Sequence, residues 1–390
     1  MHLSKFSLLL TLLGILACAC TPGFQGELVG AIRETQATGV SRVEVPSPPT
    51  RRLVPGELIL AATREDFPSV VLGDESFIAV EAADGTWSDE EAVIGVVIKG
   101  QARAYPIRLL SLVEVINDEI AEQNIAVTWC PLCFTAIVYD RQVDGQSLTF
   151  GVSGYLYKNN LVMYDHQSET LWSQAVGEGL RGAHRAERLK LLPSDLTSWG
   201  QWKAAYPHTM ILSPQGILED GTELVDPYSR YYRSAAAGIA GRENEDNRLP
   251  VKSLVIGLAI GENAKAYPLE TIKENGLIED LVGAEPVLLV ERRSTGTIEV
   301  FSRRTDYGTL NFSLDPSSGE LTDSRTGSSW AVASGMATEG ALTGTRLTKM
   351  QAPLLFWFAW ADLYPDTGIY SLDSIGSRSE TDFTGRYQSR

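Results

Sequence analysis

Two cysteines separated by two residues stand in the middle of an apolar stretch of the chain. The stretch runs from Ile125 to Asp140, and the segment Cys130-Pro-Leu-Cys133 interrupts it once. Residues rich in Val, Ile, Thr and Tyr are typical of β-strands, and Pro131 cannot continue a hydrogen-bonded ladder. We therefore expect a strand, a tight turn and a second strand, with both thiols at the tip of the hairpin. A thioredoxin-type pair would instead begin a helix, whose N-terminus lowers the thiol pKa.

A pair of thiols at one turn can serve three kinds of chemistry. With further ligands from Asp165-His166, Met163 or His184, it could bind a transition metal. Thiolate and imidazole suit zinc, whereas thiolate, thioether and imidazole in an exported protein suit copper. Alone, the pair could be a thiol-disulfide oxidoreductase couple, or a structural or inert pair. We favour a site for one metal ion, copper in preference to zinc, with the ligands Cys130, Cys133, His166 and Asp165.

A hydrolase is the weakest interpretation of this region. The segment Gly151-Val-Ser153-Gly154 lacks the second glycine of a nucleophile elbow, because Tyr155 stands at that position. Asp165 and His166 are adjacent, so in a strand they would point to opposite faces and could not act together on one serine. The residues leave open whether the chain is an enzyme at all.

The region around the cysteines has a second copy in the chain. Residues 94–106 align with residues 256–268 at an offset of 162, and seven of the thirteen aligned pairs are identical. The register continues far beyond this segment, with one later shift to an offset of 158. So long a register predicts a tandem duplication. We call residues 58–215 unit one and residues 222–373 unit two.

Each unit is expected to consist of short strands, turns and two short helices. The pattern of unit one predicts a hairpin turning at Lys99-Gly100, a helix from Pro106 onward, and a helix over 196–206. Trp199 and Trp202 lie at helical spacing, which favours packing of that helix against a core. The predicted fold class is α+β, mostly antiparallel β, with an internal tandem duplication of two homologous units.

Unit two keeps the pattern of unit one but lacks its candidate ligands. The residues that replace Cys130, Cys133 and His166 are, in order, Arg292, Thr295 and Ser324. The hairpin pattern therefore does not depend on sulfur, which favours a functional role for the cysteines over a structural one. We interpret unit two as a degenerate copy that serves as a scaffold.

The N-terminus is typical of an exported protein. A short cationic region and an apolar run too short to span a bilayer indicate a signal peptide over residues 1–17. The residues before Cys18 resemble a bacterial lipoprotein box, with Cys20 a less regular candidate, and acylation would anchor the chain. The alternative is an ordinary cleaved secretory signal. A tether over 18–57 and a tail over 374–390 flank the folded part. We expect a membrane-anchored lipoprotein in the periplasm or at the cell surface.

Charge and composition exclude some partners. The net charge of −16 repels phosphate backbones, so nucleic acid is not an expected partner. A hydrophobic content of 44% is ample for a buried core, and four cysteines do not form a disulfide framework. Composition names no protein partner and no small-molecule substrate.

Several motifs together resemble one prokaryotic family, the domain of unknown function DUF3179. They are Thr128-Trp-Cys-Pro-Leu-Cys133, Phe150-Gly-Val-Ser-Gly154, Met163-Tyr-Asp165, Leu171-Trp-Ser-Gln174 and Asp226-Pro-Tyr228. The resemblance spans nearly all of the folded region and supports the choice of the cysteine pair, but it implies no activity. In that family a His-Glu pair commonly precedes an Asn-Asp step, where this chain has Val113-Glu114, and an Arg commonly stands at the position of His166.

Overall fold

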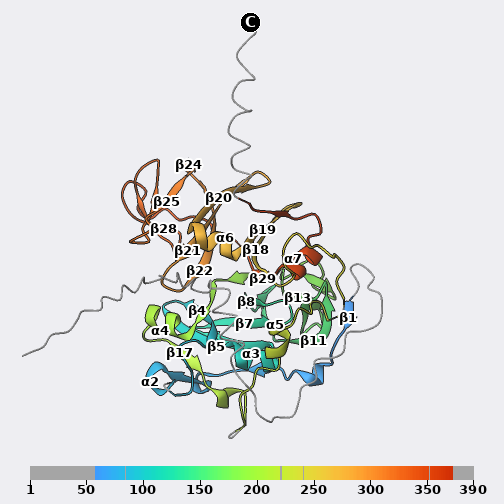
Figure 1. Ribbon diagram of the computed structural model, residues 1–390. Helices are drawn as coiled ribbons and strands as arrows, with labels where there is room; N and C mark the ends of the chain where they lie inside the picture. Colours follow the sequence, from blue (N-terminus) through green and yellow to red (C-terminus); the bar gives the residue numbers. More distant parts are fainter. Residues whose placement is uncertain (1–57, 84, 220–221, 240, 351, 372–390) are drawn as a thin grey trace, which may run out of the picture.

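The computed structural model describes residues 58–371, except 84, 220–221, 240 and 351 (Figure 1). The predicted signal peptide (1–17), the tether (18–57) and the tail (374–390) lie outside the described residues, as do Cys18 and Cys20. No helix within 58–371 is long and apolar enough to cross a membrane.

Three sheets and one small hairpin make up unit one. In spatial order, the first sheet contains Ser194–Ser198 (β16), Ala92–Ile98 (β4), Gln101–Pro106 (β5), Met210–Leu212 (β17) and Phe77–Ala79 (β3), and the second contains Leu191–Leu192 (β15), Thr135–Asp140 (β8), Gln123–Cys130 (β7), Val115–Ile120 (β6) and Val70–Val71 (β2). The third contains Leu58–Leu60 (β1), Phe150–Tyr157 (β11), Asn160–Asp165 (β12), Leu171–Ser173 (β13) and Gly179–Arg181 (β14). The hairpin consists of Gln142–Val143 (β9) and Gln146–Ser147 (β10). All pairings are antiparallel except β17 with β5 and β2 with β6.

Unit two has three smaller sheets and a hairpin. Their strands are Leu354–Phe356 (β29), Leu254–Ile260 (β18), Asn263–Pro268 (β19) and Gly368–Ile369 (β30); Leu277–Val282 (β20), Glu285–Arg292 (β21) and Thr297–Ser302 (β22); Phe312–Leu314 (β25), Leu321–Asp323 (β26), Ser329–Ala331 (β27) and Met336–Glu339 (β28); and Arg304–Thr305 (β23) with Gly308–Thr309 (β24). Here β30 runs parallel to β19.

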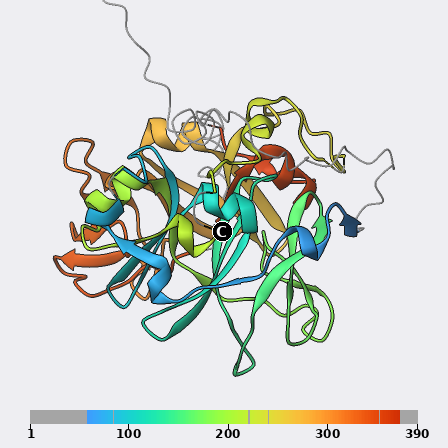
Figure 2. The same ribbon diagram turned by 90° about the horizontal axis from the view of Figure 1, so that it is seen from below.

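The helices of the described chain are short. They are Val80–Ala83 (α2), Ile107–Val113 (α3), Trp199–Ala205 (α4), Ser229–Arg233 (α5), Leu269–Asn275 (α6) and Trp357–Leu363 (α7), with 3-10 turns at Arg64–Asp66 (η1), Asp74–Ser76 (η2) and Pro214–Gly216 (η3). Seen from below, the sheets are spread around a common centre in a ring (Figure 2). The fold is therefore mostly antiparallel β, as the sequence predicts.

Local expectations from the sequence are largely confirmed. The strands β7 and β8 form the predicted hairpin, with Cys130 opposite Thr135, and Lys99-Gly100 turns β4 into β5. The helix expected over 196–206 begins only at Trp199. The residues before it form β16, which pairs with β4, and Ser198 then caps the helix by accepting a hydrogen bond from the backbone N–H of Gln201.

The elements of unit two follow the same order as those of unit one. The segments β4-β5-α3-β6-β7-β8 and β18-β19-α6-β20-β21-β22 have equal lengths and corresponding bounds, 162 residues apart. Side-chain hydrogen bonds correspond as well. The hydroxyl of Tyr105 donates to Asp118 at 2.5 Å, and that of Tyr267 donates to Asp280 at 2.9 Å.

The two units share one hydrophobic core. The largest buried cluster combines the β7-β8 region of unit one with β29 and α7 of unit two, and two smaller clusters lie wholly within unit two. In Figure 1, β29 lies against β8 at the boundary between the units. The backbone N–H of Phe356 donates to the carbonyl of Cys133 at 2.9 Å, so unit two holds the cysteine turn in place.

Candidate functional site

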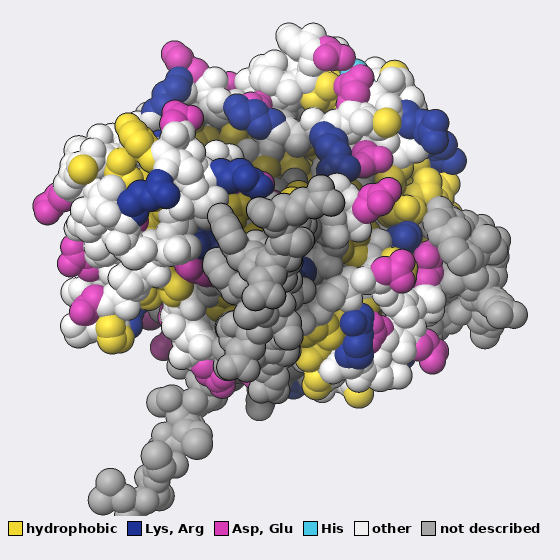
Figure 3. Space-filling model, turned by 90° about the horizontal axis from the view of Figure 1, so that it is seen from above, with side chains coloured by type: hydrophobic (Ala, Val, Ile, Leu, Met, Phe, Trp, Pro, Cys, Tyr) yellow, Lys and Arg dark blue, Asp and Glu magenta, His cyan; other side chains and the backbone are white. Residues whose placement is uncertain are grey.

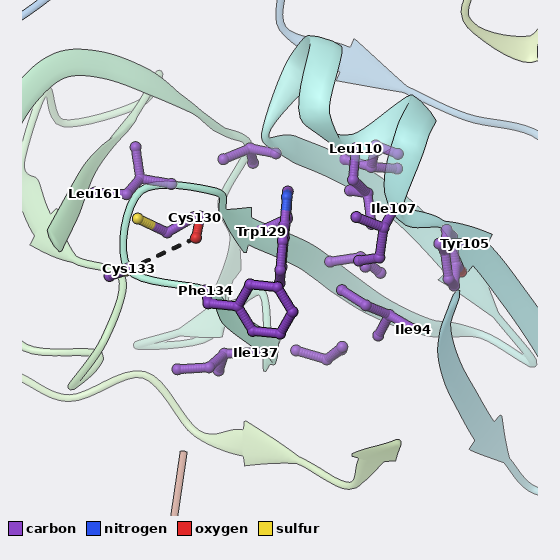
Figure 4. Packing of buried hydrophobic residues seen from close by; sticks show 14 of the residues in the cluster. Ile94, Tyr105, Ile107, Leu110, Trp129, Cys130, Cys133, Phe134, Ile137 and Leu161 are labelled. Atoms are coloured by element: carbon purple, nitrogen blue, oxygen red, sulfur yellow. Dashed lines mark hydrogen bonds between the residues drawn. The ribbon is translucent and has the colours of Figure 1, made fainter. Parts of the chain in front are cut away.

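The two cysteines lie at the tip of the β7-β8 hairpin, buried and not bonded to each other. The side chain of Cys130 points away from Trp129 and towards Leu161 (Figure 4). The sulfur of Cys133 lies 2.7 Å from the hydroxyl oxygen of Thr135 and 3.8 Å from the carbonyl oxygen of Cys130. A turn that converges two sulfurs in this way is suited to thiol chemistry or to metal binding.

The turn closes with a residue in an unfavourable backbone conformation. Phe134 has φ 61°, where the corresponding residue of unit two is Gly296 with φ 64°. A side chain in the left-handed region costs roughly 1–2 kcal/mol. The ring of Phe134 packs against Trp129, Tyr232 and Phe356, with centroid distances of 5.0, 5.9 and 5.1 Å, and this packing offsets the cost.

A buried carboxyl group lies beside the cysteines. Glu114 follows the last residue of α3 with φ 57°, where unit two has Gly276 with φ 70°. Its side chain is buried and accepts a hydrogen bond from the hydroxyl of Tyr228 at 2.9 Å. A glutamate in a conformation that suits glycine, with its charge removed from water, has a double energetic cost. Such residues are typical of functional sites.

Burial and charge set the protonation of this carboxyl group. Burial raises the pKa of Glu114 well above its usual value, and the negative charge of a Cys130 thiolate raises it further. The hydrogen bond from Tyr228 opposes this rise without cancelling it. Glu114 therefore holds its proton to a higher pH than an exposed glutamate does.

The two thiols differ in acidity. Burial raises the pKa of Cys130, but hydrogen bonds from the Cys133 thiol and from backbone groups of Cys133, Leu161 and Leu132 outweigh burial, so the pKa falls below its usual value. The pKa of Cys133 is raised well above its usual value by burial, by its hydrogen bond to Cys130 and by the charge of Cys130. The pair therefore combines a more acidic thiol with a less acidic one.

A cavity of about 520 Å³ reaches this group of residues. Its wall includes Glu114, Tyr228, Leu132 and Leu161. Leu132 and Leu161 also hydrogen-bond to Cys130 through their backbones, and a negative charge on Cys130 acts on Glu114 and Tyr228. A ligand in the cavity would therefore lie next to the residues that surround the sulfur. Apolar pockets with a few convergent polar groups are typical of small-molecule sites.

A bulge in β11 shapes one wall of the cavity. The register of β11 with β12 shifts between Val152 and Leu156, and Gly154 within the bulge has φ 80°. Its carbonyl accepts hydrogen bonds from the backbone N–H groups of Ala61 and Ala62 at 2.9 and 3.1 Å. A Cβ at position 154 would clash with the carbonyl oxygen of Ala62. Only glycine fits this approach.

The first part of unit two, before β18, closes the site from the other side. The carboxylate of Asp226 accepts a hydrogen bond from the backbone N–H of Tyr228 at 2.8 Å, and burial raises the pKa of Asp226 to about 7. On α5, the hydroxyl of Tyr231 donates to the carbonyl of Leu132 at 2.8 Å. The motif Asp226-Pro-Tyr228 therefore positions the hydroxyl that meets Glu114.

The predicted ligands Asp165 and His166 lie at the far end of β12. Leu161 contacts Cys130 through its backbone, and Asp165 is four residues further along the strand, about 13 Å at 3.3 Å per residue. Asp165 is buried and accepts a hydrogen bond from the indole N–H of Trp172 at 3.0 Å. His166 is exposed and stacks on Tyr164 with a centroid distance of 4.9 Å. The described contacts do not join these residues to the sulfurs.

The other candidate residues have local partners. Met163 lies opposite Trp172 in the sheet. His184 lies 3.0 Å from Glu187 and 4.0 Å from Asp144, and within the described ranges this is the group of three potential metal ligands that approach within 4.8 Å. No cysteine belongs to it.

The serine considered for a hydrolase is already bonded. The hydroxyl of Ser153 donates to the carbonyl of Val162 at 2.5 Å and accepts a hydrogen bond from the backbone N–H of Tyr155 at 3.1 Å. No contact joins it to His166, so the arrangement gives no support to a catalytic triad.

Sequence reasoning missed Glu114 and Tyr228 as site residues. The alignment between the units contained a signal for the first, because a glutamate replaces Gly276 at a helix end that favours glycine. Tyr228 lies outside the aligned segments of the two units, and its hydrogen bond to Glu114 spans 114 residues of sequence. No local pattern could have indicated that contact.

Comparison with known proteins identifies the family. No curated protein and no solved structure matches the chain. A family model described as "Protein of unknown function (DUF3179)" matches residues 64–367, which is most of the chain. The motifs that carry the resemblance include the cysteine turn, the β11 bulge and the Asp226-Pro-Tyr228 segment, and these three meet at the cavity. The chain belongs to the DUF3179 family.

Proposed function

We propose that the protein is a thiol-disulfide oxidoreductase with Cys130 as the attacking thiol and Cys133 as the resolving thiol. The observation that carries this proposal is the buried carboxyl group of Glu114 beside two thiols of unequal acidity. The thiolate is the nucleophile in disulfide exchange, and a carboxyl group with a raised pKa can exchange protons near neutral pH.

The first step joins the protein to a disulfide substrate, RSSR′. The Cys130 thiolate attacks one substrate sulfur, so a Cys130–SR bond forms and the substrate S–S bond breaks. The leaving R′S⁻ takes the proton of Glu114 and departs as R′SH. Glu114 is then a carboxylate, ready to act as a base.

The second step completes the transfer of two electrons. Glu114 takes the proton of Cys133, and the resulting thiolate attacks the sulfur of Cys130. The Cys130–Cys133 disulfide forms, the Cys130–SR bond breaks, and RS⁻ leaves with the proton held by Glu114. The dithiol has been oxidised and the substrate disulfide reduced to two thiols. The reverse sequence forms a disulfide in a dithiol substrate.

Trapping of the mixed disulfide tests this assignment. Cys133→Ser should accumulate a mixed disulfide on Cys130 when treated with a small disulfide, visible as the added mass of one RS group. Cys130→Ser should not, because burial still raises the pKa of the remaining Cys133 thiol. Glu114→Gln should slow the first step about a hundredfold. Folded and reduced Cys133→Ser that forms no adduct with the disulfide would sink the proposal.

A second candidate is a transition-metal site on the same sulfurs. One observation favours it: two buried sulfurs without a disulfide lie beside a carboxyl group. Soft thiolates suit copper in preference to zinc. The proposed ligands are then Cys130, Cys133 and Glu114, because the contacts of His166 lie elsewhere. Elemental analysis of reduced protein should show metal near one per chain, lost in Cys130→Ser/Cys133→Ser and kept in His166→Ala. Protein without metal in the reduced state contradicts this candidate.

We also infer that the chain arose by internal duplication and is exported with a lipid at Cys18. The corresponding bounds of the elements and the matched Tyr-Asp pairs support the duplication. An experimental structure in which residues 94–209 did not superpose on residues 256–367 would contradict the duplication.

The lipoprotein box supports the lipid anchor. The wild-type protein should incorporate a radioactive fatty acid, and Cys18→Ser should not. Incorporation into Cys18→Ser would indicate that Cys20 is the acylated residue instead.

The charge of the protein favours small-molecule partners over nucleic acid. The net charge is −16, and on the described part of the face in Figure 3 basic side chains are interspersed with acidic ones rather than gathered in a track. Nucleic-acid binding depends on concentrated positive charge. The cavity beside Glu114 therefore remains the proposed place for a substrate.

A further inference from the structure

The cavity beside Glu114 has a mostly apolar wall. The side chains that contribute apolar surface include Phe67, Leu112, Val152, Leu156 and Ile239. Its volume of about 520 Å³ is enough for a small organic molecule and too small for a folded partner. Neither cysteine lines the cavity, but Leu132 and Leu161, whose backbones hydrogen-bond to Cys130, do. A substrate that enters the cavity must leave much of its hydration shell behind, so any charge on it needs a partner in the wall.

The wall contains two carboxyl groups, of which Glu114 is the protonated acid of the proposed mechanism and Asp66 carries the negative charge. Among the described residues that line the cavity there is no Lys, Arg or His, whereas Glu114 lies inside and Asp66 at the exposed rim. The carboxylate of Asp66 accepts hydrogen bonds from the backbone N–H and the hydroxyl of Thr63, which hold it in position. An anion entering the cavity would meet negative charge without a cation to pair with.

Two cations on elements next to the wall are directed elsewhere. Arg64, beside Asp66 in the sequence, pairs with Glu169 at 2.7 Å. The guanidinium of Arg181 lies 6.0 Å from the centre of the Tyr155 ring, and Arg181 is exposed to solvent. Arg64 is already neutralised by Glu169, and neither arginine lines the cavity.

We propose that the cavity selects small disulfides that carry no negative charge. The proposal rests on the proposed oxidoreductase function and adds the class of substrate. The apolar wall accepts the alkyl groups beside the S–S bond, and the carboxylate of Asp66 at the rim attracts ammonium groups and repels carboxylates. Anionic disulfides, including those of peptides with free carboxylates, are excluded by the same charge.

Three disulfides of matched size test this selectivity. Bis(2-hydroxyethyl) disulfide, cystamine and 3,3′-dithiodipropionate share the same CH₂CH₂–S–S–CH₂CH₂ centre and differ only in their uncharged, cationic or anionic ends. For each disulfide, we measure the rate at which it oxidises reduced full-length protein at low ionic strength. This rate is divided by the rate at which the same disulfide reacts with 2-mercaptoethanol under the same conditions. We expect the relative rate with the anionic disulfide to be about tenfold lower than with the other two.

A charge reversal at the rim tests the cause. Asp66→Lys should raise the relative rate with dithiodipropionate and lower that with cystamine. Glu65→Lys makes the same change of charge one residue away, outside the cavity wall, and should alter both ratios by less than about twofold. Asp66→Asn keeps an acceptor for Thr63 and should give an intermediate result even if the lysine variant folds poorly.

The outcomes separate the two proposals. Equal relative rates with all three disulfides, or a preference for the anionic one, would overturn the selectivity and leave the oxidoreductase function standing. Reaction with none of them, in protein whose thiols are reduced and whose fold is intact, would overturn the oxidoreductase function and with it the substrate class. Equal effects of Asp66→Lys and Glu65→Lys would show that overall charge, and not the rim, governs the rates.

Discussion

Two residues near the cysteines have backbone conformations that their types disfavour. Glu114 and Phe134 both have positive φ, and unit two has glycine at both positions. The chain therefore keeps side chains at two turns where the same fold is compatible with glycine. Packing with Trp129 and Phe356 explains Phe134. Glu114 has no comparable apolar packing, so its retention fits a chemical role.

Replacement of Glu114 by glycine separates chemistry from stability. Glu114→Gly removes the cost of the positive φ and of a buried carboxyl group, while it loses one hydrogen bond to Tyr228. We expect the free energy of unfolding to change by no more than about 1 kcal/mol. Disulfide reduction should nevertheless be slowed about a hundredfold, as in Glu114→Gln. Chemical denaturation and single-turnover kinetics measure the two effects.

Phe134→Gly is the matched control for this variant. It relieves the same backbone cost but removes an aromatic ring from the core, so it should destabilise the fold by about 3–5 kcal/mol. Equal stability losses in Glu114→Gly and Phe134→Gly would show that Glu114 has a structural role.

Asp226 should make stability depend on pH. Its folded pKa of about 7 exceeds the value expected in the unfolded chain, so the folded state holds its proton more tightly. The stabilisation is fully present below about pH 4 and is lost as pH rises through 7, by up to about 4 kcal/mol. Asp226→Asn can still accept the hydrogen bond from Tyr228 and should flatten this part of the profile. Denaturation of both proteins between pH 4 and 8 tests the difference, and parallel profiles would contradict the assignment.

At the scale of elements, local patterns predicted what local interactions determine. The β7-β8 hairpin and α3 follow from strand propensity, a proline and a short apolar run, and each is confirmed. The bulge at Gly154 is different, because the carbonyl of Gly154 accepts hydrogen bonds from Ala61 and Ala62, more than 90 positions earlier in the chain. The contact of Tyr228 with Glu114 is also non-local. The hairpin of the site was therefore predictable, while its acid, its cavity and the separation of Cys130 from His166 were not.

Gly154→Ala should detach the segment that covers the cavity. The added Cβ would clash with the carbonyl of Ala62 in a residue that already has φ 80°. We expect a loss of about 2 kcal/mol in stability and faster amide exchange at Ala61 and Ala62, whose N–H groups donate to Gly154. Hydrogen-exchange mass spectrometry measures the second effect.

Gly100→Ala is the control for this change. Gly100 has φ 85° in the turn between β4 and β5, and an added Cβ would meet nothing within 4 Å. Only the backbone cost of about 1 kcal/mol should appear, without a change in exchange near the cavity. If Gly154→Ala behaves in the same way, the close approach to Ala62 has no role in holding the segment.

At the scale of the molecule, the hairpin turns of the two units make reciprocal contacts. The carbonyl of Cys133 in unit one accepts a hydrogen bond from Phe356 of unit two, and the carbonyl of Thr295 in unit two accepts one from Thr197 of unit one at 2.5 Å. Where unit one has Cys130, unit two has Arg292, which pairs with Asp195 and Glu299 in a buried network. One turn carries the thiols while the other serves as an anchor between the units.

Unit two should therefore control how well the thiols of unit one are protected. Phe356 packs on Phe134 and donates its backbone N–H to Cys133, so Phe356→Ala should loosen the cysteine turn and speed alkylation of Cys130 under native conditions. It should also cost about 3–5 kcal/mol of stability.

Phe301→Ala is the matched control, because Phe301 is equally buried in a cluster wholly within unit two. It should cost a similar free energy without exposing Cys130 locally. Alkylation rates below the unfolding transition distinguish the variants, and equal acceleration in both would mean that the thiols react only through global unfolding.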